Sequence, residues 1–171
     1  MGQSRSYVVV GNGIAGVTAA EMLRVEDVSC AITMIAEDPF PAYFRPALKD
    51  YLGGKLEEGK LWARPASFYT EQRIRFVPGC VAGIDAAQHV AHLQNGRRIG
   101  YDRLLLANGA RARTLNCAGL DLEGVSTLRT VSDYRAIMQR LRHVRRVVVS
   151  GSGTLALESA ETLRHRGYEV T

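Results

Sequence analysis

Short apolar runs, separated by turns and by segments of helical spacing, define the pattern of this chain. The first run ends at Val10 and leads through a glycine turn into an alanine- and leucine-rich segment, which we expect to be helical to about Arg24. The run at 31–35 is typical of a buried parallel strand and ends in the segment 36–38. This order of strand, helix and strand predicts an α/β fold built on a parallel sheet.

The pattern changes to closely spaced strands in the middle of the chain. The pair Asn95-Gly96 predicts a hairpin, because both central residues of a two-residue turn need positive φ. We therefore expect an antiparallel β-meander, at about 74–101, inserted into the α/β unit. Its strands are predicted at 74–77, 81–85, 89–93 and 98–101, and a continuous apolar run returns at 104–106.

Two further helices are predicted from residues that are typical of helix starts and ends. One spans 46–52, with a proline near its start and the pair Gly53-Gly54 beyond its end. The other begins at the segment 130–133, where Thr and Asp have the spacing of a capping box, and runs to about His143.

The strand and glycine turn at the start of the chain recur near its end. Residues 145–156 repeat the order of residues 5–16, which is a β-branched run, a glycine turn and a helical segment. We expect two strand-turn-helix units, the first within a domain at 1–144 and the second beginning an incomplete domain at 145–171. The edge of this C-terminal stub offers a surface for a homodimer.

Composition and charge indicate a globular protein and exclude several other classes. The chain is 46% hydrophobic and 23% charged, as in globular proteins. Its apolar runs are too short to cross a bilayer and no signal peptide precedes them, so we predict a cytoplasmic protein without membrane contact. The net charge is +5, but the basic residues are spread along the chain, which indicates a solvated surface rather than a nucleic-acid site.

The first glycine turn carries a Gly-x-Gly-x-x-Gly pattern that follows a strand and opens a helix. Gly11 permits the tight turn, Gly13 lets the backbone approach a diphosphate, and Gly16 lets the helix pack closely on the strand. The backbone amides that open the helix, including those of Ile14 and Ala15, are expected to bind that diphosphate.

An acidic residue completes the dinucleotide-binding spacing. Glu37 lies about 20 positions beyond the third glycine, where such a carboxylate accepts hydrogen bonds from the ribose hydroxyls. Asp38 is the competitor for this role. The alternative for the whole motif is an ordinary strand-loop-helix with incidental glycines.

Taken in order along the chain, these motifs resemble the FAD-dependent pyridine nucleotide-disulfide oxidoreductases. The shared features are the first glycine motif with Glu37, the meander before the segment 104–110, the segment 124–130, and the second glycine motif at 151–158. The resemblance implies a parallel Rossmann-like FAD-binding sheet with an inserted antiparallel meander, followed by an incomplete second Rossmann unit.

The segment 43–49, Tyr-Phe-Arg-Pro-Ala-Leu-Lys, is similar to one in the rubredoxin and ferredoxin reductases and in the flavin portion of NADH-dependent nitrite reductase. This similarity implies that Arg45 lies close to the flavin ring or the diphosphate, and that Lys49 contacts the flavin. A surface position for Arg45 beside a proline turn is the alternative.

Two other cofactor contacts are implied by the resemblance. Ala107, Asn108 and Gly109 stand where the family has an Ala-Thr-Gly flavin loop. Val81 would present its backbone to the adenine, and an ordinary strand position is the alternative for this residue.

The second glycine motif resembles the NAD(P)H site of the family. Gly151 and Gly153 form the turn, Ala156 replaces the third glycine, and Glu158 stands where the family has an acidic residue near the nicotinamide. The residue that would distinguish NADH from NADPH is expected beyond Thr171.

The positions of the cysteines separate the branches of the family. Disulfide reductases need a CxxxxC pair beside the flavin, and the coenzyme A disulfide and peroxide reductases need one cysteine near position 43. Cys30, Cys80 and Cys117 match neither arrangement. Electrons are therefore expected to leave for another protein, a metal centre or dioxygen.

Together these features predict the N-terminal FAD-binding fragment of a FAD-dependent NAD(P)H oxidoreductase, which by itself would not sustain turnover. Neither an acid–base catalytic residue nor a metal site is identified in the sequence. The alternative function is a non-catalytic nucleotide-binding module or subunit.

Overall fold

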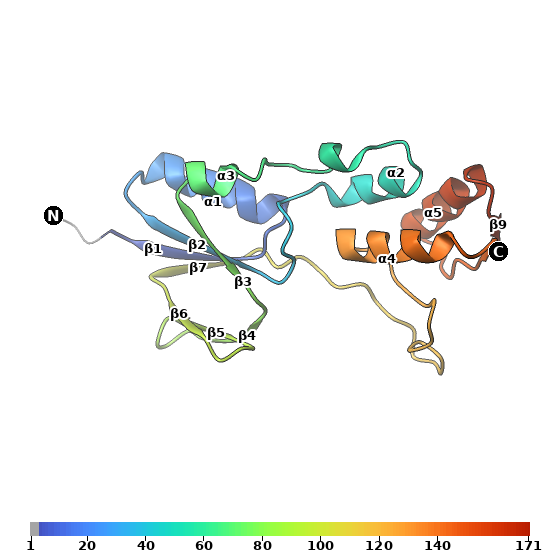
Figure 1. Cartoon of the computed structure of the whole chain (residues 1–171). Helices are drawn as coiled ribbons and strands as arrows, with labels where there is room; N and C mark the ends of the chain where they lie inside the picture. Colours follow the sequence, from blue (N-terminus) through green and yellow to red (C-terminus); the bar gives the residue numbers. More distant parts are fainter. Residues whose placement is uncertain (1–3) are drawn as a thin grey trace. The chain divides into compact units, whose positions relative to one another are not determined.

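The computed structural model describes residues 4–171, which form two compact units (Figure 1). The first unit comprises the chain up to residue 43 together with 62–110. The second comprises 44–61 together with 111–171.

A four-stranded parallel sheet forms the centre of the first unit, in the order β3-β2-β1-β7. The predicted α/β fold and its parallel sheet are confirmed. The strands are β1 (Ser6–Val10), β2 (Ala31–Ala36), β3 (Ile74–Pro78) and β7 (Arg103–Leu106), and the helices of this unit are α1 (Ile14–Glu26) and α3 (Phe68–Glu71).

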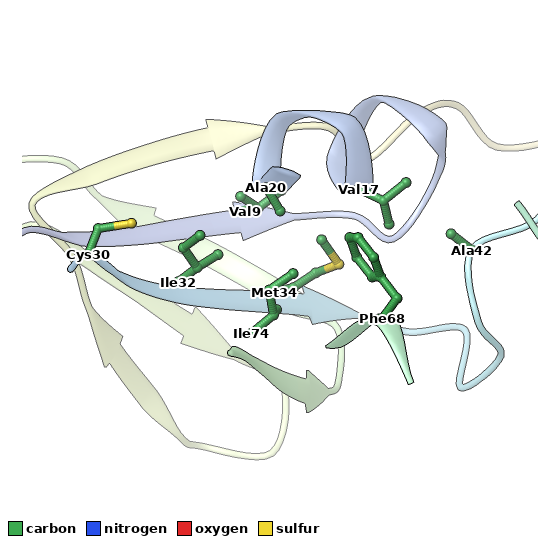
Figure 2. Packing of buried hydrophobic residues seen from close by; sticks show 9 residues of the cluster. All are labelled: Val9, Val17, Ala20, Cys30, Ile32, Met34, Ala42, Phe68 and Ile74. Atoms are coloured by element: carbon green, nitrogen blue, oxygen red, sulfur yellow. The ribbon is translucent and has the colours of Figure 1, made fainter. Parts of the chain in front are cut away.

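One face of the sheet is covered by α1. Alternate residues of a strand point to opposite faces, and Val9 and Met34 point toward the helix. They pack with Val17 of α1 in a buried cluster that also contains Phe68 and the thiol of Cys30 (Figure 2). Cys30 is therefore a small buried residue of the core.

The opposite face is covered by a three-stranded antiparallel meander, β4 (Val81–Asp85), β5 (Val90–Leu93) and β6 (Arg98–Gly100). A second buried cluster joins these layers, with Val8, Val10, Ile35 and Val77 from the sheet and Ala91 and Leu93 from the meander. Burial on both faces explains the continuous apolar run of the first strand.

The meander is shorter than predicted, because β3 belongs to the parallel sheet. Ile32 of β2 pairs with Ile74 of β3, and Ile35 pairs with Val77, in parallel register. Both Ile74 and Val77 are buried, one on each face of the sheet. The apolar spacing of this segment indicates a strand, but it does not select a parallel or an antiparallel neighbour.

The predicted hairpin between β5 and β6 is present, but its turn differs from the expected two-residue type. Gly96 has φ +82° and Asn95 does not have positive φ. Leu93 N–H donates to the carbonyl of Arg97 at 2.9 Å, and Gly96 N–H donates to the carbonyl of Leu93 at 3.0 Å. This is a three-residue loop, in which only the last residue needs the left-handed conformation.

Arg24 closes the carboxyl end of α1, although its side chain is 91% buried. Its guanidinium donates hydrogen bonds to the carbonyls of Cys30 at 2.7 Å, Val28 at 3.0 Å and Gln72 at 3.0 Å. These contacts join α1 to the start of β2 and to the segment before β3.

Helices dominate the second unit. The expected capping box is confirmed at the start of α4, where Asp133 N–H donates to Thr130 Oγ1 and the Asp133 carboxylate accepts from Thr130 N–H. The elements are the 3₁₀ helices Arg45–Ala47 and Glu58–Lys60, the α-helices α2 (Leu48–Leu52), α4 (Val131–Leu141) and α5 (Thr154–His165), and the strands β8 (Arg146–Val147) and β9 (Glu169–Val170).

Side-chain contacts hold these helices together. The rings of Tyr51 on α2 and Tyr134 on α4 stack with their centroids 3.7 Å apart. Arg166, which follows α5, donates to the carbonyl of Leu52 at 2.6 Å. Strands β8 and β9 pair in parallel, which confirms that a second strand-turn-helix unit begins here.

Within residues 4–171, no helix combines the length and the apolar character that a bilayer crossing requires. In the same range, no group of His, Cys, Asp and Glu side chains could hold a metal ion.

Candidate functional site

The first glycine turn is enclosed by backbone on two sides. Gly11 has φ +114°, and a Cβ built on it would lie 2.2 Å from the carbonyl oxygen of Ala107. A Cβ on Gly16 would lie 2.1 Å from the carbonyl oxygen of Gly11. Only glycine fits either position, which agrees with the roles predicted for both residues.

Gly13 stands in a different environment, because a Cβ built on it would meet nothing within 4 Å. It precedes α1, and no side chain among residues 4–171 caps that helix. Val17 is the first residue whose N–H bonds within the helix, to the carbonyl of Gly13 at 3.1 Å. The amides of Ile14, Ala15 and Gly16 therefore have no acceptor within the helix, an arrangement that can bind an anion.

The two acidic residues after β2 have different partners. Asp38 Oδ2 accepts a hydrogen bond from the hydroxyl of Tyr43 at 2.7 Å, which ties this carboxylate to its own loop. Glu37 directly follows β2 and is exposed. The ribose-binding role of Glu37 stays a prediction.

The predicted flavin loop lies beside the same turn. Ala107 N–H donates to the carbonyl of Val10 at 2.8 Å, which extends the pairing of β1 and β7 to the edge of the turn. Asn108 and Gly109 follow it and are exposed. Val81, by contrast, begins β4 and packs with the second buried cluster, so its contacts are those of a strand residue.

In the second unit, two predicted residues form an ion pair. Lys49 Nζ lies 2.5 Å from Glu158 Oε1, with about a third of each side chain exposed. The Glu158 carboxylate holds the pKa of the Lys49 ammonium above its usual value. The sequence identifies both residues but not their contact. Arg45 donates from Nη1 to the carbonyl of Arg129 at 2.9 Å in this unit.

The second glycine turn is more open than the first. Gly151 has φ +140°, and the atom nearest to a Cβ built on it is the Cβ of Ala156, at 3.3 Å. A Cβ on Gly153 would meet nothing within 4 Å, and no side chain of the described residues caps α5.

Comparison with protein-family models matches residues 5–171 to the family described as pyridine nucleotide-disulphide oxidoreductase. The chain belongs to this family. The match covers both glycine turns, so the predicted resemblance is confirmed.

Curated members of the family include reductases of electron-transfer proteins. The chain is 38% identical to the ferredoxin reductase component of chlorobenzene dioxygenase from Cupriavidus sp. (strain PS12), over 95% of this chain and 40% of that protein. It is 35% identical to rubredoxin-NAD(+) reductase from Pseudomonas putida, over 97% of this chain and 44% of that protein. The chain thus spans about two fifths of the length of these relatives.

A solved structure agrees with the fold. The putidaredoxin reductase in its covalent complex with putidaredoxin superimposes with a TM-score of 0.85 at 31% identity, covering 97% of this chain and 41% of that one.

The family implies FAD as the cofactor. The features of the first unit fit the adenosine diphosphate half of FAD. That half needs unpaired amides, space at the turn and a carboxylate for the ribose. The open position at Gly13, the uncapped start of α1 and the exposed Glu37 meet these needs.

Proposed function

We propose that this chain is the FAD-binding part of an NAD(P)H oxidoreductase that passes electrons to a separate redox protein. The observation that carries the proposal is the space at Gly13 before an uncapped helix, within a turn whose other two glycines are enclosed by backbone. No neighbouring atom requires a glycine at position 13. A ligand that approaches the backbone there explains why the residue lacks a side chain.

In this proposal, the amides of Gly13, Ile14 and Ala15 bind the diphosphate, and Glu37 accepts hydrogen bonds from the ribose. Asn108 and Gly109 line one side of the proposed cofactor site, where the end of β7 meets the turn. FAD, when bound, accepts a hydride and releases electrons onward. The protein residues position it and exclude water.

The second unit would serve the nicotinamide side of the reaction. We propose that Gly151 and Gly153 bind NAD(P)H, and that the paired Lys49 and Glu158 lie near the reacting rings. The domain boundary proposed between 144 and 145 assigns α5 to the NAD(P)H-binding domain. In this scheme Arg45 and Val81 contact FAD.

The electron acceptor is proposed from the chemistry of the cysteines and from the relatives. Cys30 is buried in the core, which removes it from the electron path. The relatives are named as reductases of ferredoxin, rubredoxin and putidaredoxin, so we propose a small iron–sulfur or rubredoxin-type acceptor. A nitrite reductase flavin portion and a cytoplasmic location stay predictions.

The variant Gly13→Val tests the proposal. Its backbone conformation, φ −89° and ψ −176°, suits any residue, and its side chain would occupy the open space. We expect at least about a 10-fold loss of affinity for FAD and ADP, measured by titration calorimetry. Valine is a poorer N-cap than glycine, so we also expect a loss of about 1 kcal/mol in stability. Gly59→Val, at another open position, is the matched control and should bind as the wild type does.

Two results would contradict the proposal. One is a wild-type chain that binds neither FAD nor ADP. The other is a Gly13→Val variant that binds them with unchanged affinity.

A further inference from the structure

A side chain within the glycine turn links it to two other segments of the first unit. Asn12 lies between Gly11 and Gly13 and is half-buried. Its Nδ2 donates to the carbonyl of Phe40 at 2.8 Å, and its Oδ1 accepts from the hydroxyl of Tyr69 at 2.7 Å. Tyr69 Oη in turn accepts from Ala42 N–H at 3.1 Å.

The three hydrogen bonds fix one another's direction. Ala42 N–H is a donor, so the Tyr69 oxygen accepts from it and directs its own proton to Asn12 Oδ1. The Asn12 amide then presents its NH₂ group to the Phe40 carbonyl. The Ala42 N–H, the Tyr69 hydroxyl and the Asn12 amide group each donate to an acceptor in this cluster, and a half-buried network of this kind is rigid.

The ring of Tyr69 is held in place independently of these bonds. It packs edge-on against Phe68 and Phe76, with centroid distances of 5.3 Å to each. Burial raises the pKa of the Tyr69 hydroxyl, so the hydroxyl keeps its proton at neutral pH. The hydroxyl is thus a permanent donor on a fixed support.

The network joins the two sides of the nucleotide site. Asn12 belongs to the turn whose amides would bind the diphosphate, whereas Phe40 and Ala42 belong to the loop that begins at Glu37. Gly11 N–H donates to the carbonyl of Ile35 at 2.8 Å and fixes the base of the turn on β2. Asn12 fixes the outer side of the same turn.

From this arrangement we propose that Asn12 and Tyr69 are positioning residues, which hold the diphosphate-binding turn at a set distance from the ribose-binding Glu37. The proposal rests on the proposed function, because it assigns how that site is pre-organised. A nucleotide that contacts both sides gains affinity when their spacing is fixed beforehand. A ligand that contacts one side gains nothing from the spacing.

This difference gives a test that a purely structural role would not satisfy. ADP contacts both sides, whereas adenosine lacks the diphosphate. In the full 171-residue chain, Tyr69→Phe should weaken ADP binding about 5- to 10-fold, the equivalent of one net hydrogen bond. The affinity for adenosine, measured by NMR shift titration, should not change. Tyr168→Phe, which removes a hydroxyl bonded to the Leu141 carbonyl in the second unit, is the matched control.

The outcomes separate this proposal from the proposed function. A wild type that binds ADP, with a Tyr69→Phe variant that binds ADP equally well, overturns the positioning role alone. Equal losses for ADP and adenosine also overturn it, because they indicate general damage to the site. A wild type that does not bind ADP overturns both. Asn12→Ala removes the other partner and must reproduce the selective loss if Tyr69→Phe does not fold.

Discussion

The two glycine turns of this chain have similar spacing but different surroundings. In the first, backbone from the end of β7 and from the turn itself lies within about 2 Å of where Cβ atoms on Gly11 and Gly16 would be. In the second, the nearest atom to a Cβ on Gly151 is a side-chain carbon at 3.3 Å. The motif specifies a turn in both places, but among residues 4–171 only the first turn has the backbone of a neighbouring strand against its glycines.

The difference extends to the residue between the glycines. Asn12 is bonded to Phe40 and Tyr69, whereas Ser152 of the second turn makes no side-chain hydrogen bond among the bonds found in residues 4–171. The following predictions test this contrast.

The largest expected effect comes from adding a methyl group to each turn. Gly11→Ala places Cβ inside the contact distance of the Ala107 backbone and at φ +114°, so we expect a loss of at least about 3 kcal/mol in unfolding free energy. Gly151→Ala should cost about 1 kcal/mol, because only backbone strain and a close side chain oppose it. Urea unfolding, followed by Trp62 fluorescence for the first unit and by circular dichroism for the second, measures both. Equal losses would contradict the contrast.

The next effect concerns two arginines at the carboxyl ends of helices, Arg24 in the last turn of α1 and Arg166 directly after α5. Arg24→Met removes the guanidinium hydrogen bonds to the backbone carbonyls of five residues, and we expect a loss of about 3 kcal/mol. Arg166→Met removes its bond to the carbonyl of Leu52 and should cost about 1 kcal/mol. The same unfolding experiment measures both variants. A cost for Arg24→Met no greater than that for Arg166→Met would show that the buried guanidinium contributes little.

The smallest effect is the pH dependence of the Lys49–Glu158 pair. Because the pKa of Lys49 is raised in the folded protein, the pair stabilises the fold below the ordinary lysine pKa. That contribution is lost as the pH rises through the raised pKa. We expect Glu158→Gln to be less stable than the wild type at neutral pH and to approach it as the pH rises through the raised pKa of Lys49. A stability difference that does not depend on pH would contradict this account.

Local pattern was sufficient for the first turn and its cofactor candidates. Gly11, Gly13 and Glu37 are predicted as cofactor contacts from the sequence, because parallel strands bring their carboxyl ends to one edge and linear spacing then fixes their relative position. The partner of β3 could not be found in this way, since an apolar strand pairs in either direction. The contacts of Arg24, of Asn12 with Tyr69, and of Lys49 with Glu158 join distant segments and leave no periodic signal.

The most direct test of the central claim is an NMR titration of the ¹⁵N-labelled chain with ADP. If the first turn is the diphosphate site, the amide signals of Gly13, Ile14 and Ala15 will shift most, and that of Glu37 will shift with them. The signals of the second turn, at Gly153 and Thr154, will shift less at the same ADP concentration. Shifts confined to the second turn, or no shifts at either turn, would contradict the account.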